Sequence, residues 1–328
     1  MIITKTPFRV SFAGGGSDMA NFYREYGGCV LSTSINRYMY LSLHPYFDHR
    51  KTALKYSQTE IVEDINDINH KIFRCVLNDM KIEGVEISST ADVPSGTGLG
   101  SSSSFTVGLL HTLYCYKGKY VSKSRLAQEA CQVEINKLGN PIGKQDQYAA
   151  AFGGMNFISF HQDDTVSVEP VITKAETINR LQENLMMFYT GLTHDANVIL
   201  AEQKKNISQE DKTRNLIQMR DLARDMKHSL ENNELSDFGK ILNEGWIRKK
   251  ELAGGITNPK IDELYETAMK NGATGGKLLG AGGGGFLLFY CPKEYQERLK
   301  NQLRLRHFPF SFEHDGSSVV YIGDKYWE

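Results

Sequence analysis

The stretch PSGTGLGSSSSF, which begins at Pro94, constrains the fold more than any other part of the chain. It places three glycines within five residues, and then four serines, directly before the apolar run TVGLLHTLYCY. Ordered glycine costs backbone entropy, so such a cluster implies unusual φ angles or a ligand that approaches the backbone closely. Serine is a preferred residue at helix N-termini, and the apolar run has helical length. The stretch therefore predicts a glycine loop that leads into a buried helix.

The same loop is a candidate phosphate site. A helix N-terminus has unpaired N–H groups and the positive end of the helix dipole, and both attract anions. The alternative is a tight turn before a capped helix with no ligand, which is the commoner meaning of glycine and serine runs. The candidate nucleotide-binding residues are Pro94, Ser95, Gly96, Thr97, Gly98, Leu99, Gly100, Ser101, Ser102, Ser103 and Ser104.

A second glycine-rich run, GAGGGG, occupies residues 280–285. It satisfies the GxGxxG pattern of dinucleotide-binding folds, but that pattern is meaningful only between a strand and a helix. Here the sequel FLLFY has the composition of a strand. A dinucleotide-binding fold is therefore not expected.

Strand and helix patterns alternate irregularly along the chain. Strands are expected at residues 1–6, 8–13, 29–35, 38–47, 84–93, 153–160, 286–290 and 318–323. Helices are expected after Gly100 and at residues 122–138, 146–152, 259–271 and 293–303. Asn258 and Pro259 are typical of a helix start, and Gly272 is typical of its end. Since regular strand–helix–strand units are missing from this order, an α+β fold is favoured over a doubly wound sheet.

Chain-wide properties narrow the class of protein. A chain of 328 residues exceeds one typical domain, so two lobes are expected. The net charge of −1 offers no bulk attraction to nucleic acid or to an anionic membrane, and no segment reaches the roughly 18 to 20 apolar residues of a membrane span. The five cysteines are widely spaced and contain no CxxC pair, which argues against disulfides and a cysteine zinc site. We therefore expect a soluble cytoplasmic protein with reduced thiols and small-molecule partners.

Two acidic residues stand in unusual places. Glu134 lies within the apolar arc of the predicted 122–138 helix, between Ala130 and Leu138. A carboxylate on a buried face needs a partner, and a metal ion suits it, although a salt bridge at the rim of the arc is the alternative. Asp146 directly precedes an alanine-rich segment, where an N-cap is the alternative to a chemical role.

Together these features resemble the parts of a phosphoryl-transfer site. Such a site needs a phosphate cradle, an acid that holds Mg²⁺, a second acid and a nearby basic group, because its catalysis is mostly positioning and charge neutralisation. PSGTGLGSSSS resembles the phosphate loop of the GHMP kinases, which phosphorylate small molecules with ATP. TPFRVSFAGGGSD resembles their first motif and KLLGAGGGGFLL their third, in the order that the family has.

The resemblance implies a fold and a set of residue roles. The fold would be α+β, with a ribosomal-protein-S5-like N-terminal domain at residues 1–170 and a ferredoxin-like C-terminal domain at residues 171–328. ATP and Mg²⁺ would be required. Ser102 and Glu134 would hold Mg²⁺, Asp146 would act on the acceptor hydroxyl, and Arg9 would lie near the transferred phosphate. The implied substrate-binding residues are Gly15, Gly16, Asp18, Gly282 and Gly283.

The segment RVSFAGGGSDMANFYREYGGCVLSTSINRYMYL is similar to bacterial kinases of D-glycero-D-manno-heptose 7-phosphate. This similarity implies that a heptose 7-phosphate becomes the 1,7-bisphosphate, on the route to GDP-heptose for surface glycans. Arg24, Arg37 and Lys144 are candidates for a cationic pocket around the 7-phosphate. The alternatives are a kinase of a free sugar such as fucose, or a regulator that binds sugar or nucleotide without catalysis. A homodimer also stays open.

Overall fold

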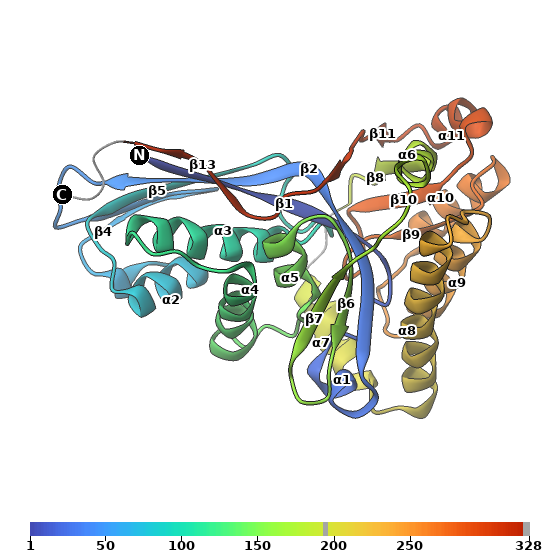
Figure 1. Ribbon diagram of the computed structural model, residues 1–328, viewed down its shortest axis with the longest axis horizontal. Coiled ribbons are helices and arrows are strands. Elements are labelled where there is room, and N and C mark those ends of the chain that lie inside the picture. Colours follow the sequence, from blue (N-terminus) through green and yellow to red (C-terminus); the bar gives the residue numbers. More distant parts are fainter. Residues whose placement is uncertain (193–195, 324–328) are drawn as a thin grey trace.

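The computed structural model describes residues 1–192 and 196–323, which form a nine-stranded sheet, a four-stranded sheet and the helices that cover them (Figure 1). The nine-stranded sheet has the order β13-β1-β2-β5-β3-β4, with β12 and β6 also paired to β2, and β7 paired to β6. Its strands are β1 (Ile2–Ala13), β2 (Gly28–Pro45), β3 (Thr52–Lys55), β4 (Thr59–Val62), β5 (Val85–Ala91), β6 (Met155–Phe160), β7 (Val166–Pro170), β12 (Phe312–Glu313) and β13 (Ser318–Ile322).

The first two strands are longer than the sequence patterns predicted. Residues 1–6 and 8–13 form one continuous strand, β1, and residues 29–35 and 38–47 likewise merge into β2. Proline has no N–H to donate within a sheet. The structure accommodates Pro7 with a register shift between Pro7 and Phe8 in the β1–β2 pairing.

The helices lie largely on one side of the large sheet or beside the small one. In Figure 1, α2, α3 and α4 lie along one face of the large sheet. The helices of this first half are α1 (Ala20–Tyr26), the 3₁₀ turn η1 (Ile65–Asp67), α2 (Lys71–Met80), α3 (Ser101–Tyr116), α4 (Lys123–Cys131), the wide turn η2 (Gln132–Lys137) and α5 (Gln145–Phe152). Helix α3 is apolar on nearly all sides because it is buried between the sheet and the neighbouring helices.

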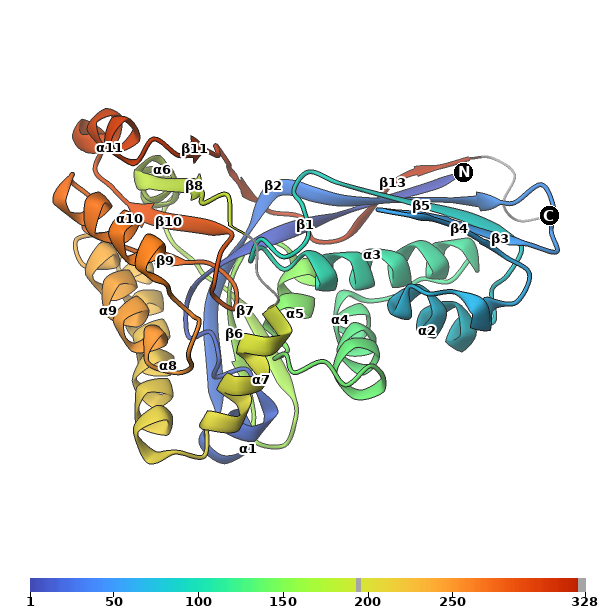
Figure 2. The ribbon, with the colours of Figure 1, turned by 180° about the vertical axis from the view of Figure 1, so that it is seen from behind.

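The smaller sheet has the strand order β11-β8-β10-β9, formed by β8 (Leu185–Tyr189), β9 (Gly275–Leu278), β10 (Phe286–Tyr290) and β11 (Arg306–His307). The remaining helical segments are α6 (Ala175–Asn184), α7 (Ala196–Asn206), α8 (Glu210–Glu231), α9 (Phe238–Lys250), α10 (Pro259–Lys270), η3 (Lys293–Tyr295) and α11 (Gln296–Leu303). Figure 2 shows α8, α9 and α10 beside this sheet. In chain order these strands stand fourth, first, third and second, with helices after the first and third, which is the ferredoxin-like arrangement.

The predicted α+β fold with two kinds of sheet is therefore confirmed. The end of the chain returns to the first sheet, because β13 pairs with β1 and β12 pairs with β2. Two strands from the predicted second domain thus complete the sheet of the first, and a domain boundary at residue 170 stays a prediction. Among the described residues, no helix combines the length and the apolar character that a membrane crossing requires.

The two glycine-rich runs meet at the junction of the two sheets. Gly98 has a φ of +86°, and a Cβ at this position would lie 2.4 Å from the carbonyl oxygen of Leu279. Gly280 in turn would place a Cβ 2.3 Å from the Cα of Gly98. Both glycines are thus required by close approach as well as by backbone conformation.

We predict that Gly98→Ala destabilises the protein more than Gly139→Ala. Both glycines have positive φ, so each substitution brings a backbone penalty of about 1–2 kcal/mol. Only Gly98 adds a steric clash, since no atom of the described part of the chain lies within 4 Å of the Cβ position of Gly139. Urea unfolding would measure both losses, and equal losses would contradict the close contact.

Candidate active site

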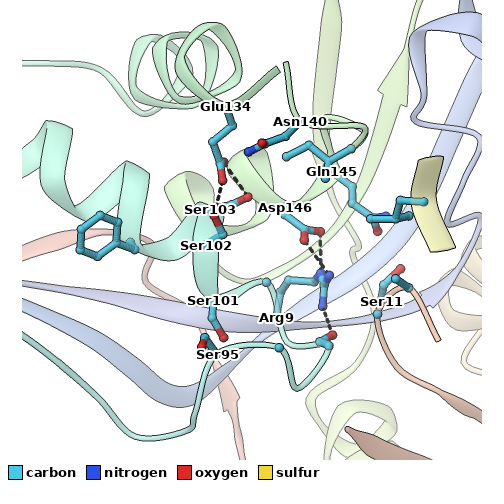
Figure 3. Close-up of a pocket in the computed structure, with 18 of the residues that line it drawn as sticks. Arg9, Ser11, Ser95, Ser101, Ser102, Ser103, Glu134, Asn140, Gln145 and Asp146 are labelled. Atoms are coloured by element: carbon cyan, nitrogen blue, oxygen red, sulfur yellow. Dashed lines mark hydrogen bonds and ion pairs between the residues drawn. The ribbon is translucent and has the colours of Figure 1, made fainter. Parts of the chain in front are cut away.

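A cavity of about 830 Å³ is lined by residues from both halves of the chain (Figure 3). The predicted site residues that line it are Arg9, Gly15, Gly16, Asp18, Pro94, Ser95, Gly96, Gly98, Gly100, Ser101, Ser102, Ser103, Glu134 and Asp146. The predicted residues that do not line it are Thr97, Leu99, Ser104, Gly282 and Gly283, although Gly280 and Ala281 of the same glycine run do. The sequence thus identified residues from segments far apart in the chain that line one cavity.

The predicted glycine loop and helix start are both present. Gly96, Gly98 and Gly100 have φ angles of +73°, +86° and +79°, as the glycine cluster implied. Helix α3 begins at Ser101, earlier than its apolar run, so the serines form its first turn. First-turn N–H groups have no partner within the helix, and the N-cap Gly100 supplies no side chain to cap them. This end of α3 is therefore open to a phosphate group.

Glu134 is fully buried and accepts hydrogen bonds from three side chains. The donors are Ser102 Oγ at 2.6 Å, Ser103 Oγ at 2.8 Å and Gln147 Nε2 at 2.7 Å. No basic side chain among the described residues forms an ion pair with it, so the salt-bridge alternative is wrong. Burial raises the pKa of Glu134, with a smaller contribution from the charge of Asp146. Glu134 lies in η2, a wide helical turn of a kind frequent at functional sites.

The donor set around Glu134 fits Mg²⁺. Magnesium prefers oxygen ligands and is commonly held by one or two carboxylates together with substrate phosphates. The Ser102 hydroxyl and the Glu134 carboxylate supply such oxygens beside the N-terminus of α3 (Figure 3). Within residues 1–192 and 196–323, no cluster of three or more His, Cys, Asp or Glu side chains offers a complete protein cage. A metal at Ser102 and Glu134 would thus need phosphate oxygens to complete its coordination.

Arg9 and Asp146 form a bidentate ion pair. Arg9 Nε donates to Asp146 Oδ1 and Arg9 Nη2 to Asp146 Oδ2, each at 2.8 Å. The remaining guanidinium nitrogen, Nη1, donates to the carbonyl oxygen of Gly98 at 2.7 Å. Asp146 is the second residue of α5, and the cap residue is Lys144, so the N-cap alternative is wrong. The pair instead directs a carboxylate into the cavity next to the glycine loop (Figure 3).

Asp18 provides a second carboxylate on another wall of the cavity. It is 2% exposed and accepts hydrogen bonds from the backbone N–H groups of Gly16 at 2.9 Å and Gln145 at 3.1 Å. Burial raises its pKa, while these backbone donors oppose the shift. Gly143 is needed here, because a Cβ at that position would lie 2.0 Å from Asp18 Oδ2.

Two buried lysines in the cavity wall were missed by the sequence analysis. Lys249 on α9 and Lys277 on β9 are 8% and 7% exposed. Burial lowers the pKa of Lys249 to about 8 and also lowers the pKa of Lys277. Lys249 belongs to the basic run RKK, which is typical of a solvated helix face, and the first residue of KLLGAGGGG is Lys277. The place of Lys277 in the third motif was the one sequence feature that could have identified a lysine of the site.

The three cations predicted to surround an acceptor phosphate do not line the cavity. Arg24 and Lys144 both contact Asp164, at 2.9 and 3.5 Å. Arg37 donates to the carbonyl oxygen of Pro309 at 2.6 Å. These side chains contact other surface segments and not the cavity. The prediction that they surround an acceptor phosphate is therefore corrected by the structure.

Comparison with known proteins agrees with these features. The models for "GHMP kinases N terminal domain" and "GHMP kinases C terminal" match residues 67–154 and 226–309. A D-glycero-alpha-D-manno-heptose 7-phosphate kinase of Campylobacter jejuni subsp. jejuni serotype O:2 is 30% identical, covering 96% of this chain and 97% of that protein. A bifunctional fucokinase/GDP-fucose pyrophosphorylase of Arabidopsis thaliana is 26% identical, covering 90% of this chain and 30% of that protein.

A solved structure of a heptose phosphate kinase is also similar to this chain. A D-glycero-D-manno-heptose 1-phosphate kinase from Bacteriodes thetaiotaomicron superposes with a TM-score of 0.81 at 25% identity, covering 99% of this chain and 100% of that one. The chain therefore belongs to the GHMP kinase family. It is an ATP-dependent phosphotransferase, as the sequence motifs predicted.

We predict that Glu134→Gln raises the Mg²⁺ concentration needed for half-maximal turnover by about tenfold or more, because the charge that attracts the cation is lost. Glu129→Gln is the matched control, since Glu129 lies on the adjoining helix α4 and contacts Tyr114 and Arg125 outside the cavity. Magnesium titrations of initial rate would measure the effect. If both variants needed the same Mg²⁺ concentration as the wild type, Glu134 would not be a ligand.

We predict that Asp146→Asn lowers turnover by about 10²- to 10⁴-fold, the usual range for losing a general base. ATP affinity should change little, because asparagine still accepts one hydrogen bond from Arg9. Asp164→Asn is the control, since it breaks another arginine–aspartate pair that lies outside the cavity. Turnover numbers would be compared after thermal melts have shown that both variants are folded, and a full rate for Asp146→Asn would rule out its role.

Proposed function

We propose that this sugar kinase transfers the terminal phosphoryl group of ATP to the anomeric hydroxyl of D-glycero-D-manno-heptose 7-phosphate, giving the 1,7-bisphosphate. The observation that carries the proposal is the Arg9–Asp146 pair, which faces the same cavity as the open N-terminus of α3. Phosphoryl transfer requires a cradle for anionic oxygens and an oriented acceptor hydroxyl. This pair contacts the glycine loop through Gly98 and presents a carboxylate to the cavity.

In this proposal each residue has a defined task. The N–H groups of the glycine loop and of the first turn of α3 bind the nucleotide phosphates. Ser102 and Glu134 hold Mg²⁺, which would neutralise phosphate charge during transfer. Asp146 orients the acceptor hydroxyl and takes its proton as the new P–O bond forms and the bond to ADP breaks. Arg9 keeps that carboxylate aimed at the cavity.

The choice of a heptose phosphate is supported by two features. The relative with 30% identity over nearly its full length is named as a heptose 7-phosphate kinase. In the cavity, Asp18 offers a carboxylate to sugar hydroxyls, and Lys249 and Lys277 offer positive charge to an anionic group. The product would then enter GDP-heptose synthesis for surface glycans, in the cytoplasm.

A free sugar is the second candidate for the acceptor, because the fucokinase relative matches most of this chain. A regulator without catalysis is a weaker candidate. Ser102, Glu134 and Asp146 are all present and all line one cavity, whereas a silent relative has no need to keep these three groups together.

The acceptor is tested by offering the enzyme ATP, Mg²⁺ and a panel of sugars in a coupled ADP assay. The panel contains D-glycero-D-manno-heptose 7-phosphate, the corresponding 1-phosphate, the free heptose, fucose and galactose. We expect the highest kcat/KM with the 7-phosphate and a 1,7-bisphosphate product by phosphorus NMR. A free sugar used with equal or higher efficiency would refute the acceptor while leaving the kinase assignment intact.

A further inference from the structure

Lys249 and Lys277 bring two ammonium groups to one wall of the cavity without any acidic partner. Lys277 Nζ donates to the carbonyl oxygens of Ser11 and Phe12, each at 2.9 Å, and Lys249 Nζ donates to the carbonyl oxygen of Gly280. No carboxylate of residues 1–192 or 196–323 forms an ion pair with either lysine. Buried charges are costly unless they are paired. The charges of Lys249 and Lys277 therefore lack a counter-charge on this wall of the cavity.

Both ammonium groups keep donors for a ligand. An ammonium group has three N–H donors, of which Lys277 spends two on backbone carbonyls and Lys249 spends one. The hydroxyl of Ser11 adds another donor, because it is buried, lines the cavity and has no hydrogen-bond partner among the residues that the structure describes. Arg9, the third buried cation nearby, has its charge paired with Asp146 and also donates to Gly98. The lysines and Ser11 are therefore the groups available to an additional anion.

Ser11 and Lys277 are offset along β1 from the residue that contacts the nucleotide loop. Arg9 and Ser11 are two residues apart on β1, so their side chains share one face of the strand and are offset by about 7 Å. Arg9 contacts the glycine loop through Gly98, whereas Ser11 lies beside Gly15, whose Cβ position is 3.7 Å from Ser11 Oγ. Ser11, and Lys277 which donates to the carbonyl oxygens of Ser11 and Phe12, thus lie toward Gly15 and away from the start of α3, whereas Lys249 contacts Gly280 beside Gly98.

We propose that Lys277 and Lys249, with the hydroxyl of Ser11, bind the phosphate group that the acceptor already carries, and so make the enzyme select sugar phosphates over free sugars. The inference rests on the proposed function, because it needs a phosphorylated acceptor. A phosphate dianion would accept the unused ammonium donors and neutralise both buried charges, which an uncharged sugar would not do.

The test compares Lys277→Met with Lys250→Met. Lys250 is the matched control: it follows Lys249 on α9, contacts Asp262 at 3.4 Å and does not line the cavity. We expect Lys277→Met to raise KM for D-glycero-D-manno-heptose 7-phosphate by about 10- to 100-fold, the loss expected for a charged hydrogen bond. KM for ATP and kcat/KM for the free heptose should stay within about twofold of wild type.

Lys249→Met serves as the second variant if Lys277→Met does not fold, as judged by its thermal melt, and it should show the same loss of discrimination. Inorganic phosphate provides an independent probe. It should inhibit the wild type competitively against the heptose 7-phosphate, and Lys277→Met should weaken this inhibition at least tenfold while Lys250→Met leaves it unchanged.

The outcomes separate the two proposals. Equal losses with the heptose 7-phosphate and with the free heptose, or a raised KM for ATP, would overturn the inference, because the lysines would then serve the transferred phosphoryl group. An unchanged KM for the 7-phosphate in both lysine variants would also overturn it. A wild type that prefers a free sugar would overturn the proposed acceptor, and the phosphate inhibition would still report whether the lysines bind an anion.

Discussion

The guanidinium group of Arg9 joins the parts of the molecule on which its chemistry depends. It binds both carboxylate oxygens of Asp146 on α5 and the carbonyl oxygen of Gly98 in the glycine loop, while its own backbone N–H donates to Leu99. With 4% of its surface exposed, Arg9 has little access to water as an alternative partner. A planar group with donors in fixed directions can hold three segments at once, which a lysine at this position could not do. Strand, loop and helix are therefore oriented by one side chain.

The cavity around Arg9 is lined by both acidic and basic side chains. Asp18 and Asp146 supply the carboxylates, and Glu134 lies behind the first turn of α3. Lys277 approaches from β9 of the second sheet and Lys249 from helix α9, and burial lowers the pKa of both. Such groups are expensive to bury alone, and they are retained where a ligand completes the charge balance. Residues from both halves of the chain therefore line one cavity.

Much of the local structure could be predicted because its causes are local. The positive φ angles of Gly96, Gly98 and Gly100 follow from their clustering, and the N-cap at Asn258 follows from the Asn–Pro pair. Glu134 was identified from its place in an apolar arc, and it is fully buried. Strand lengths were less predictable, because β1 pairs with β2 over nearly its full length and this pairing joins segments that the sequence patterns predicted as separate strands.

The sequence by itself determined the family, the fold class, the glycine loop and the acidic residues that line the cavity, since glycine runs, caps and hydrophobic arcs act within a few residues of the chain. Only the tertiary structure decided which cations face the cavity. Arg24, Arg37 and Lys144 are held by surface partners, whereas Lys249 turns inward from a run of three basic residues and Lys277 meets the carbonyl oxygens of β1. The sequence around a basic residue does not distinguish a side chain that lies on the surface from one that faces the cavity. The direction of that side chain depends on contacts between segments more than 200 residues apart, such as Lys277 and Ser11, and these contacts exist only once the two sheets have packed together.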